Sequence, residues 1–307
     1  MSYRVALSPS SFAARDKAPL DLLQESGVEV VPNPYGRRLT EDEAIEHLRG
    51  VDGLIAGLEP LNRRVLSTAN RLKAIARVGI GMDNVDLDAA RELGIAVSNT
   101  PDGPSNAVAE LTVAAALNMS RGLLEASNAM HEGRWEKKIS KGLSDACALI
   151  VGYGRIGRRV AGLLEPFGVE LLAVDPFLPE SSFSNARPVN LDEGLAAADI
   201  VSLHTSGRET VLGPQEFAVM KADALLLNSA RAELVDEDAL IDALESGKLG
   251  GAWFDVFWEE PYSGRLTNYP QVIMSPHVGT YTKSCRLDME ITAVKNVLSD
   301  LKASSAE

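Results

Sequence analysis

The sequence predicts an α/β fold made of two doubly wound parallel sheets, each in a domain of its own. Two observations support this prediction. Short apolar runs alternate with helical patterns in both halves of the chain, as expected for βαβ units. A dense cluster of turn residues, from Asn99 to Ser105, separates the two halves. With 307 residues, the chain is long enough for about two domains that each bury a core.

The first half contains short apolar runs that are typical of buried strands. These runs are Val5–Leu7, Val28–Val31, Gly53–Ala56, Ala74–Ala76 and Ile95–Val97. Helical patterns lie between them. Thr40 and Glu43 have the spacing of a capping box, in which each side chain bonds the backbone of the other residue. We therefore expect a helix to begin after Thr40.

The turn cluster is followed by a long helical pattern, which we expect Ser105 or Asn106 to cap. Its apolar stripe consists of Val108, Leu111, Ala115 and Met119. The polar continuation through Met130 and Trp135 either packs against a second copy of the chain or is a solvated connector.

The second half contains six apolar runs, which predict the six strands of a doubly wound sheet. They are Ala148–Val151, Leu171–Val174, Ile200–Leu203, Ala224–Leu227, Gly251–Phe254 and Val272–Met274. A helical pattern at Glu237–Glu245 separates two of them. The last helical pattern, Arg286–Leu301, is expected to return to the first domain. We thus expect one domain of residues 1–99 with 284–307, and a second of residues 100–283.

Three glycines, Gly152, Gly154 and Gly157, follow the first strand of the second domain at GxGxxG spacing. The first permits a tight turn, the second lets the backbone approach a pyrophosphate, and the third lets helix and strand pack closely. Asp175 ends the next run, where a carboxylate accepts hydrogen bonds from a ribose diol. The alternative is a Gly-rich turn of another α/β protein, with Asp175 merely ending a strand. The strand, helix and acid at these positions favour a Rossmann-like dinucleotide-binding domain. The first half of the chain has no such glycine triplet, so we expect no dinucleotide site there.

The charge next to the motif favours NAD over NADP. Asp175 would repel a 2′-phosphate, and the following residues Pro176, Phe177 and Leu178 offer no arginine to receive one.

The composition excludes some partners. The apolar fraction of 45% is ordinary for a soluble chain, and a net charge of −13 argues against nucleic acid or an anionic membrane. Cys147 and Cys285 have no metal-type spacing, so we expect no metal and a reducing, cytoplasmic location. No signal peptide and no bilayer-spanning run is recognisable.

Polar side chains that suit hydride chemistry follow three successive strands of the second domain. Arg231, Glu260 and His277 stand there, and the carboxyl ends of parallel strands meet at one edge. An arginine can hold a carboxylate through two bonds, and a histidine exchanges protons near neutral pH. Taken singly, each could instead be a structural or solvated residue.

The sequence resembles the D-isomer-specific 2-hydroxyacid dehydrogenase family. Within that family it is most similar to phosphoglycerate dehydrogenase-like members without a C-terminal regulatory domain. The resemblance covers nearly the whole chain. Its blocks are Arg77–Asp86, Asn99–Pro101, Ala107–Glu110, Gly152–Gly157 with Asp175, Asn228–Arg231, Asp255–Phe257 with Glu260 and Pro261, and Ser275–His277.

The resemblance implies an NAD-dependent dehydrogenase that moves hydride between nicotinamide and C2 of a 2-hydroxyacid or 2-oxoacid. It implies that His277 exchanges a proton with the C2 oxygen, that Glu260 orients His277, and that Arg231 clamps the carboxylate. Cofactor contacts are expected from Gly152, Gly154, Arg155, Ile156, Gly157, Asp175, His204, Ser229, Ala230, Asp255 and Gly279. Among these, Asp255 would hold the nicotinamide amide.

The resemblance also implies substrate contacts from the first domain, by Val78, Gly79 and Ile80, with the active-site cleft between the domains. Arg77 either holds a second anionic group of the substrate or belongs to an ion pair at a strand end. A homodimer through residues 105–135 is expected as well. Phosphoglycerate, glycerate or glyoxylate, and a phosphonate acid all remain open as substrates.

The sequence departs from the family pattern at two places. Ala232 and Glu233 stand after Arg231, where glycine is usual. The segment from His204 to Arg208 is about one residue shorter than usual, which puts its cofactor contacts in doubt. Trp258 either narrows the pocket or packs beneath it. An NAD(H)-sensing corepressor or scaffold of the same fold is the alternative function, and a formate dehydrogenase is disfavoured because those relatives have glutamine where Glu260 stands.

Overall fold

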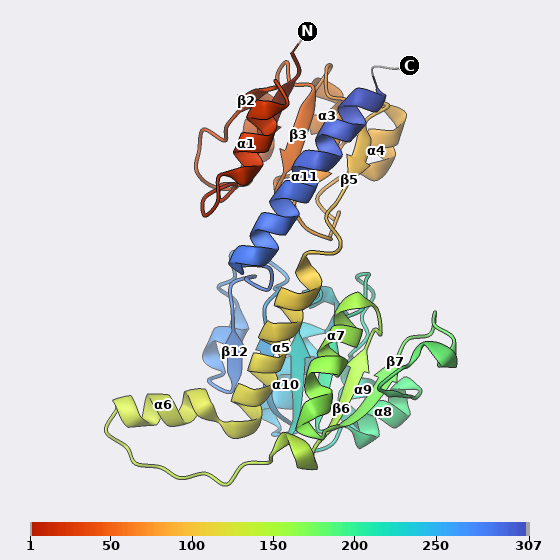
Figure 1. The fold of residues 1–307 in the computed structure, drawn as a ribbon. Coiled ribbons are helices and arrows are strands. Elements are labelled where there is room, and N and C mark those ends of the chain that lie inside the picture. The colour runs from red at the N-terminus through yellow and green to blue at the C-terminus, as the bar shows by residue number, and fades with distance from the viewer. Residues whose placement is uncertain (1, 305–307) are drawn as a thin grey trace. The chain divides into compact units, whose positions relative to one another are not determined.

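The structure is a computed structural model that describes residues 2–304. The chain forms two compact units, and each is described by itself. Unit 1 comprises residues 1–104 and 280–307, and unit 2 comprises residues 105–279 (Figure 1). The borders that the sequence predicts are at residues 99 and 284.

Unit 1 is a five-stranded parallel sheet covered by helices on both faces. Its strand order is β2-β1-β3-β4-β5, a doubly wound order. The strands are β1 (Arg4–Leu7), β2 (Glu29–Val31), β3 (Gly53–Ala56), β4 (Ala74–Arg77) and β5 (Ala96–Ser98). The helices are α1 (Ala18–Glu25), α2 (Glu41–His47), α3 (Arg63–Thr68), α4 (Leu87–Glu92) and α11 (Lys283–Ala303). All five predicted strands are present.

Both helix predictions for unit 1 are confirmed. The Thr40 side chain accepts from the Glu43 N–H, and the Glu43 carboxylate accepts from the Thr40 N–H, so α2 begins with a capping box. The C-terminal helix α11 returns to this unit, where it packs against β3, β4 and β5. A side chain at Gly53 would collide with Val297 of α11, which shows how closely helix and sheet approach.

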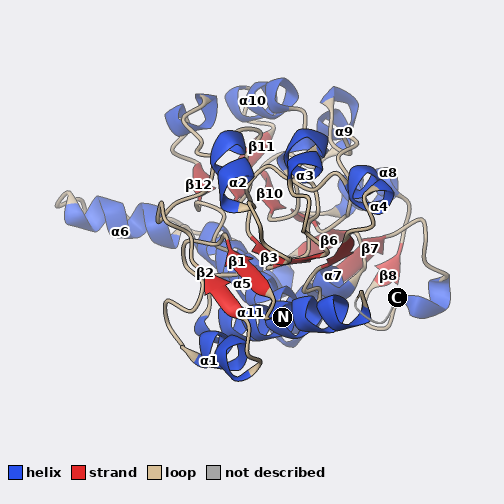
Figure 2. Ribbon diagram, turned by 90° about the horizontal axis from the view of Figure 1, so that it is seen from above, coloured by secondary structure: helices blue, strands red, loops and turns tan. Residues whose placement is uncertain are grey.

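Unit 2 is a seven-stranded parallel sheet in the order β12-β11-β10-β9-β6-β7-β8. The strands are β6 (Cys147–Val151), β7 (Glu170–Val174), β8 (Arg187–Pro188), β9 (Ile200–Leu203), β10 (Ala224–Asn228), β11 (Leu249–Phe254) and β12 (Val272–Met274). The helices are α5 (Pro104–Arg121), α6 (Leu123–His131), α7 (Arg155–Leu164), α8 (Leu191–Ala197), α9 (Pro214–Val219) and α10 (Glu237–Glu245). Helices α5 and α7 cover one face and α8, α9 and α10 the other (Figure 2).

The predicted count of six strands in unit 2 is wrong by one. The additional strand, β8, is the two-residue edge strand Arg187–Pro188. A strand this short leaves no alternation to detect, and proline is tolerated only at an edge or bulge.

The predicted caps of α5 are also wrong, because this helix begins at Pro104 and contains Ser105 and Asn106. Proline suits the first helical position, where its missing N–H costs no bond. The helical pattern continues past Arg121 but is interrupted by Gly122, which adopts φ 57° and separates α5 from α6. No helix in residues 2–304 is long and apolar enough to cross a membrane.

Candidate active site

The predicted site residues of unit 2 lie at one edge of its sheet. Gly152 follows β6, Asp175 follows β7 and His204 follows β9. Arg231 and His277 come after β10 and β12. All strands of this sheet are parallel, so their carboxyl ends share an edge, the usual place for ligands in doubly wound folds.

The three glycines of the motif have three different surroundings. A Cβ at Gly152, which has φ 92°, would lie 2.6 Å from the carbonyl carbon of His204. A Cβ at Gly157 would lie 2.1 Å from the Gly152 oxygen, so only glycine lets helix α7 approach this closely. A Cβ at Gly154 would meet nothing within 4 Å. The space beside Gly154, at the start of α7, is open for a phosphate group.

Helix α7 begins directly after Gly154, with Arg155 and Ile156 as its first residues. No side chain caps this helix. Its first N–H groups therefore face the open side of the glycine loop, where a pyrophosphate would accept hydrogen bonds from them.

Asp175 lies beside the glycine loop at the end of β7. Its carboxylate accepts from the backbone N–H of Tyr153 (3.0 Å) and from that of Phe177 (3.1 Å). Each carboxylate oxygen has a second lone pair, so the group can still accept a bond from a ribose diol. The exposed Phe177 contributes no positive charge for a 2′-phosphate. The loop and its acid thus fit NAD.

His204 supports the glycine loop from β9. Its Nε2 lies 2.8 Å from the Ser202 hydroxyl, and its backbone N–H donates to the Val151 oxygen. Burial of the ring lowers the pKa of His204 to about 3. The imidazole is therefore neutral at pH 7, so it brings no positive charge to this loop.

Glu260 and His277 are in direct contact. The Nδ1 of His277 lies 2.9 Å and 3.0 Å from the two carboxylate oxygens of Glu260. The Glu260 carboxylate also accepts from the Phe257 N–H (3.2 Å), which fixes its orientation. The His277 side chain is 43% exposed. With Nδ1 held by the carboxylate, Nε2 is the ring nitrogen available to a substrate.

Arg231 is held by the loop that follows β10. Its carbonyl oxygen accepts from the side-chain amide of Asn228 (2.8 Å), and its guanidinium Nη1 donates to the Ala230 oxygen (2.7 Å). The neighbouring Ser229 hydroxyl lies 3.4 Å from that of Thr112 on α5. Sequence reasoning missed Asn228 as a support of the site, because it ends an apolar run and is fully buried.

Asp255 is buried beneath the segment that carries His277. Its Oδ1 accepts from the Ser275 hydroxyl (2.6 Å) and the Val278 N–H (2.9 Å), and its Oδ2 accepts from the Gly279 N–H (2.7 Å). Asp255 is 1% exposed. Through these three hydrogen bonds, the Asp255 carboxylate holds residues 275–279 in place.

In unit 1, Arg77 ends β4, and Val78, Gly79 and Ile80 follow it at the carboxyl edge of their own sheet. The N–H of Val78 donates to Ala56, and that of Gly79 donates to the Thr100 hydroxyl. Gly79 has φ 138°, and a Cβ there would overlap the Arg77 guanidinium. The guanidinium thus lies over the glycine and donates to the Val78 oxygen.

A residue that the sequence reasoning missed lies at the same edge of unit 1. Glu59 is 2% exposed and accepts twice from the Gly57 N–H (3.0 and 3.2 Å). Burial raises the pKa of Glu59, and the charge of Arg77 acts against this rise. A lone glutamate after an apolar run gives no sign that it is buried.

The two departures from the family pattern meet in unit 2. Arg208, in the shortened segment, lies 3.5 Å from the carboxylate of Glu233. Trp258 packs beneath this region, where its ring lies against Phe254 and its Nε1 donates to the Val235 oxygen.

Comparisons with known proteins bear on this site. Residues 113–279 match the sequence model of the D-isomer specific 2-hydroxyacid dehydrogenase, NAD binding domain. The D-3-phosphoglycerate dehydrogenase of Homo sapiens is 37% identical over 274 residues, which are 86% of this chain and 51% of that protein. This chain thus spans about half the length of that relative. The hydroxypyruvate reductase of Thermotoga maritima is 33% identical over 273 residues, 86% of this chain and 89% of that protein.

Solved structures of other proteins have the same fold as this chain. The TT0316 protein of Thermus thermophilus superimposes with a TM-score of 0.89 at 34% identity, covering 98% of this chain and 97% of that one. The glyoxylate reductase of Paecilomyes thermophila superimposes with a TM-score of 0.87 at 28% identity, covering 99% and 96%.

Proposed function

Because this chain belongs to the D-isomer specific 2-hydroxyacid dehydrogenase family, we propose that it interconverts a D-2-hydroxyacid and the 2-oxoacid with NAD as cofactor. The observation that carries this proposal is the pairing of His277 with Glu260 at the carboxyl edge of the NAD-binding sheet. When bound, the nicotinamide supplies or accepts the hydride at C2 of the substrate.

His277 is the proton donor in the direction of reduction and the acceptor in the direction of oxidation. Its Nε2 exchanges the proton with the C2 oxygen, while Nδ1 stays on the Glu260 carboxylate. A carboxylate at Nδ1 fixes the ring orientation and stabilises the imidazolium that forms when the hydroxyl is deprotonated. The pair therefore suits both directions of the reaction.

Arg231 holds the carboxylate of the substrate. A guanidinium presents a planar fork of donors that matches a carboxylate. Its backbone is fixed by Asn228, so the side chain starts from a defined position. In unit 1, Arg77, Val78, Gly79 and Ile80 contribute to substrate binding through the Ile80 backbone and the Arg77 charge. The Val78 and Gly79 N–H groups are bonded within unit 1, so these two residues fix the shape of the loop and do not donate to the substrate.

The cofactor is held by Gly152, Gly154, Gly157 and the first turn of α7, with Asp175 on the ribose. Ser229, Ala230 and Gly279 line the same edge, and His204 supports the loop. We also propose a cytoplasmic location, which the two free and buried cysteines, Cys147 and Cys285, support.

The working form is a homodimer built through residues 105–135 and the loop that follows them. Helix α6 stands away from the rest of unit 2 (Figure 1). Large apolar side chains are exposed here, namely Leu123 (64%), Leu124 (43%), Met130 (53%), Trp135 (75%) and Ile139 (102%). Such a concentration of exposed apolar side chains is typical of a protein interface.

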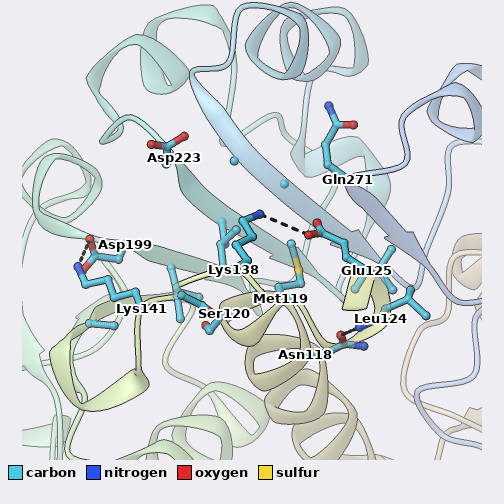
Figure 3. Close-up of a pocket in the computed structure, with 18 of the residues that line it drawn as sticks. Asn118, Met119, Ser120, Leu124, Glu125, Lys138, Lys141, Asp199, Asp223 and Gln271 are labelled. Atoms are coloured by element: carbon cyan, nitrogen blue, oxygen red, sulfur yellow. Dashed lines mark hydrogen bonds and ion pairs between the residues drawn. The ribbon is translucent and has the colours of Figure 1, made fainter. Parts of the chain in front are cut away.

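A cavity of about 600 Å³ lies beside this segment (Figure 3). Asp199, Asp223 and Gln271 line it from the amino ends of their strands, the edge opposite the glycine loop. Lys138 pairs with Glu125 (3.3 Å) and Lys141 with Asp199 (2.8 Å) at its rim. A segment of a second copy that entered this cavity would lie at the edge of the sheet opposite the glycine loop.

A panel of 2-oxoacids tests the proposed activity. Consumption of NADH with at least one of glyoxylate, hydroxypyruvate, a phosphorylated or a phosphonate 2-oxoacid is the expected result. NADH binding without turnover of any member would contradict the dehydrogenase and support a cofactor-sensing protein.

A further inference from the structure

A buried acid without an assigned role lies at the carboxyl edge of the unit 1 sheet. Glu59 follows β3 and is 2% exposed, and both of its carboxylate oxygens accept from the Gly57 N–H (3.0 and 3.2 Å). The hydroxyl of Ser8, which follows β1, donates to the same carboxylate. The Asn84 side-chain amide donates to the backbone oxygens of Glu59 (2.7 Å) and Gly57 (3.3 Å), so the loop that carries the acid is fixed.

Arg77 lies beside this loop. In the pairing of β3 with β4, Arg77 is the partner of Ala56, the last residue before the loop. The Arg77 guanidinium donates to the Val78 oxygen (2.9 Å) and covers Gly79, where a Cβ would lie 1.3 Å from Nη1. Its positive charge acts on the Glu59 carboxylate. The cation beside the substrate loop of unit 1 therefore has a buried anion of the protein as its neighbour.

The surroundings of Glu59 favour its ionised form. Burial raises the pKa of Glu59, while the hydrogen bonds from Ser8 and Gly57 and the charge of Arg77 oppose this rise. A protonated carboxyl group needs an acceptor for its proton, but the Gly57 N–H, which reaches both oxygens, can only donate. Glu59 thus offsets the positive charge of Arg77.

A second arginine at this edge has a partner of the same kind. Arg286, near the start of α11, donates to the Glu290 carboxylate (2.6 Å) and to the hydroxyl of Ser11 in the loop after β1 (3.3 Å). The side chains of Arg286 and Glu290 are 15% and 5% exposed. Glu290 also accepts from the Ala13 N–H (2.8 Å), which ties that loop to α11. The charge of Arg286 is therefore also offset within unit 1.

This distribution of charge is unfavourable for a phosphate group. A phosphate carries about two negative charges at pH 7, and proteins bind it with arginine or lysine charge that no acid offsets. Here two partly buried guanidinium groups, of Arg77 and Arg286, each have a buried carboxylate as neighbour. A phosphate at this edge would gain little attraction from Arg77 and would be repelled by Glu59. A hydrogen atom or a hydroxyl group in the same place would not be repelled.

We propose that Glu59 is a specificity-determining residue, which restricts the substrate to 2-oxoacids and 2-hydroxyacids whose carboxylate is their only negative charge. Glyoxylate and hydroxypyruvate belong to this class, whereas phosphorylated and phosphonate acids do not. Because Glu59 is buried, it acts through Arg77 rather than by touching the substrate. The inference rests on the proposed function and narrows the substrates that the sequence leaves open.

Hydroxypyruvate and its phosphate ester have the same carbon skeleton, so they test the substrate class in the wild type. We expect kcat/KM to be at least about 50-fold higher for hydroxypyruvate, mainly through a lower KM. If kcat/KM for hydroxypyruvate exceeded that for the ester by less than about 5-fold, the substrate class would be wrong, while the dehydrogenase reaction would stand. Wild-type protein that turns over no 2-oxoacid would contradict the proposed function instead.

Glu59→Gln tests the assignment to this residue, because it removes the charge and keeps the size of the side chain. The ratio of kcat/KM for hydroxypyruvate over the ester should fall about 10-fold, through a lower KM for the ester. Glu25→Gln, at an exposed acid of α1, changes the net charge equally and should keep the ratio within about 2-fold of wild type. An unchanged ratio in folded Glu59→Gln would overturn the role of Glu59.

A measurement on wild type alone covers the case in which Glu59→Gln does not fold. Glycolate and 2-phosphoglycolate are compared as inhibitors of hydroxypyruvate reduction. The inhibition constant of 2-phosphoglycolate should be at least about 10-fold higher than that of glycolate. Equal or tighter inhibition by 2-phosphoglycolate would show that this edge accepts a phosphate, and the proposal would be wrong.

Discussion

The Nδ1 of His277 lies 2.9 Å from one carboxylate oxygen of Glu260 and 3.0 Å from the other. The two residues come from segments after different strands, β12 and β11, and meet at the edge that also carries the glycine loop. The contact leaves the far ring nitrogen for a substrate and gives the imidazolium a negative partner.

Glu260→Gln should therefore lower turnover without weakening the binding of NADH. The amide still accepts a bond from Nδ1 but no longer compensates a positive ring, so we expect kcat to fall about 100-fold. The NADH dissociation constant, followed by fluorescence, should stay within about 2-fold. A variant with wild-type kcat would show that the carboxylate is only a solvated neighbour of His277.

Two glycine variants should separate cofactor binding from packing. Gly154→Ala places its methyl group in open space, so it should fold normally and weaken NAD binding about 10-fold by blocking the phosphate. Gly157→Ala drives a methyl group into the Gly152 oxygen and should destabilise unit 2 by about 1–3 kcal/mol.

Urea unfolding and NADH titration measure both effects. Equal loss of stability in the two variants would contradict this assignment of the glycines.

Asp175→Asn should relax the preference for NAD over NADP. The variant removes the charge that repels a 2′-phosphate and keeps one oxygen, which can accept from only one of the Tyr153 and Phe177 N–H groups. We expect the ratio of kcat/KM for NADH over NADPH to fall about 10-fold. Asp175→Ala should also weaken NADH binding, because the loop loses those bonds. An unchanged ratio in both variants would refute the role of Asp175.

His204 should make the stability of unit 2 depend on pH. Its folded pKa of about 3 lies below the ordinary value of 6.5, so the unfolded chain binds the proton more readily. The contribution is complete above pH 6.5 and is lost as the pH falls toward 3.

His204→Gln should make the unfolding free energy of unit 2 depend less on pH between pH 7 and pH 4. His131→Gln is a matched control, because it replaces an exposed histidine of the same unit. If the unfolding free energy of His204→Gln depended on pH as steeply as that of wild type, the His204 ring would not be held in its neutral form by burial.

Exposed apolar residues after α5 should hold the proposed dimer together. Replacing both Trp135 and Ile139 by aspartate removes two of the most exposed apolar side chains from this segment. Sedimentation should then show monomers where the wild type is dimeric, with His277 and its loop unaffected. Wild-type protein that is monomeric at micromolar concentration would contradict the dimer.

Much of the fold was predictable because its strands are buried on both faces and stand out as continuous apolar runs. Strand β8 was not, since Arg187 and Pro188 form too short a run. The positions of Arg231, Glu260 and His277 after their strands were likewise evident from the sequence.

The buried polar support was not predictable. Asn228, Asp255 and Glu59 stand at strand ends like many solvated residues, and only tertiary packing removes them from water. The sequence also offered no sign that His277 would adopt a left-handed backbone. Such features depend on which loops meet in space, which local patterns do not encode.

The most direct test is NADH oxidation by wild type and His277→Gln, side by side, with the best 2-oxoacid of the panel. We expect kcat to fall about 1000-fold or more in the variant, while its NADH dissociation constant stays within about 2-fold of wild type. Turnover by His277→Gln close to that of wild type would contradict the assignment of His277 as the proton donor.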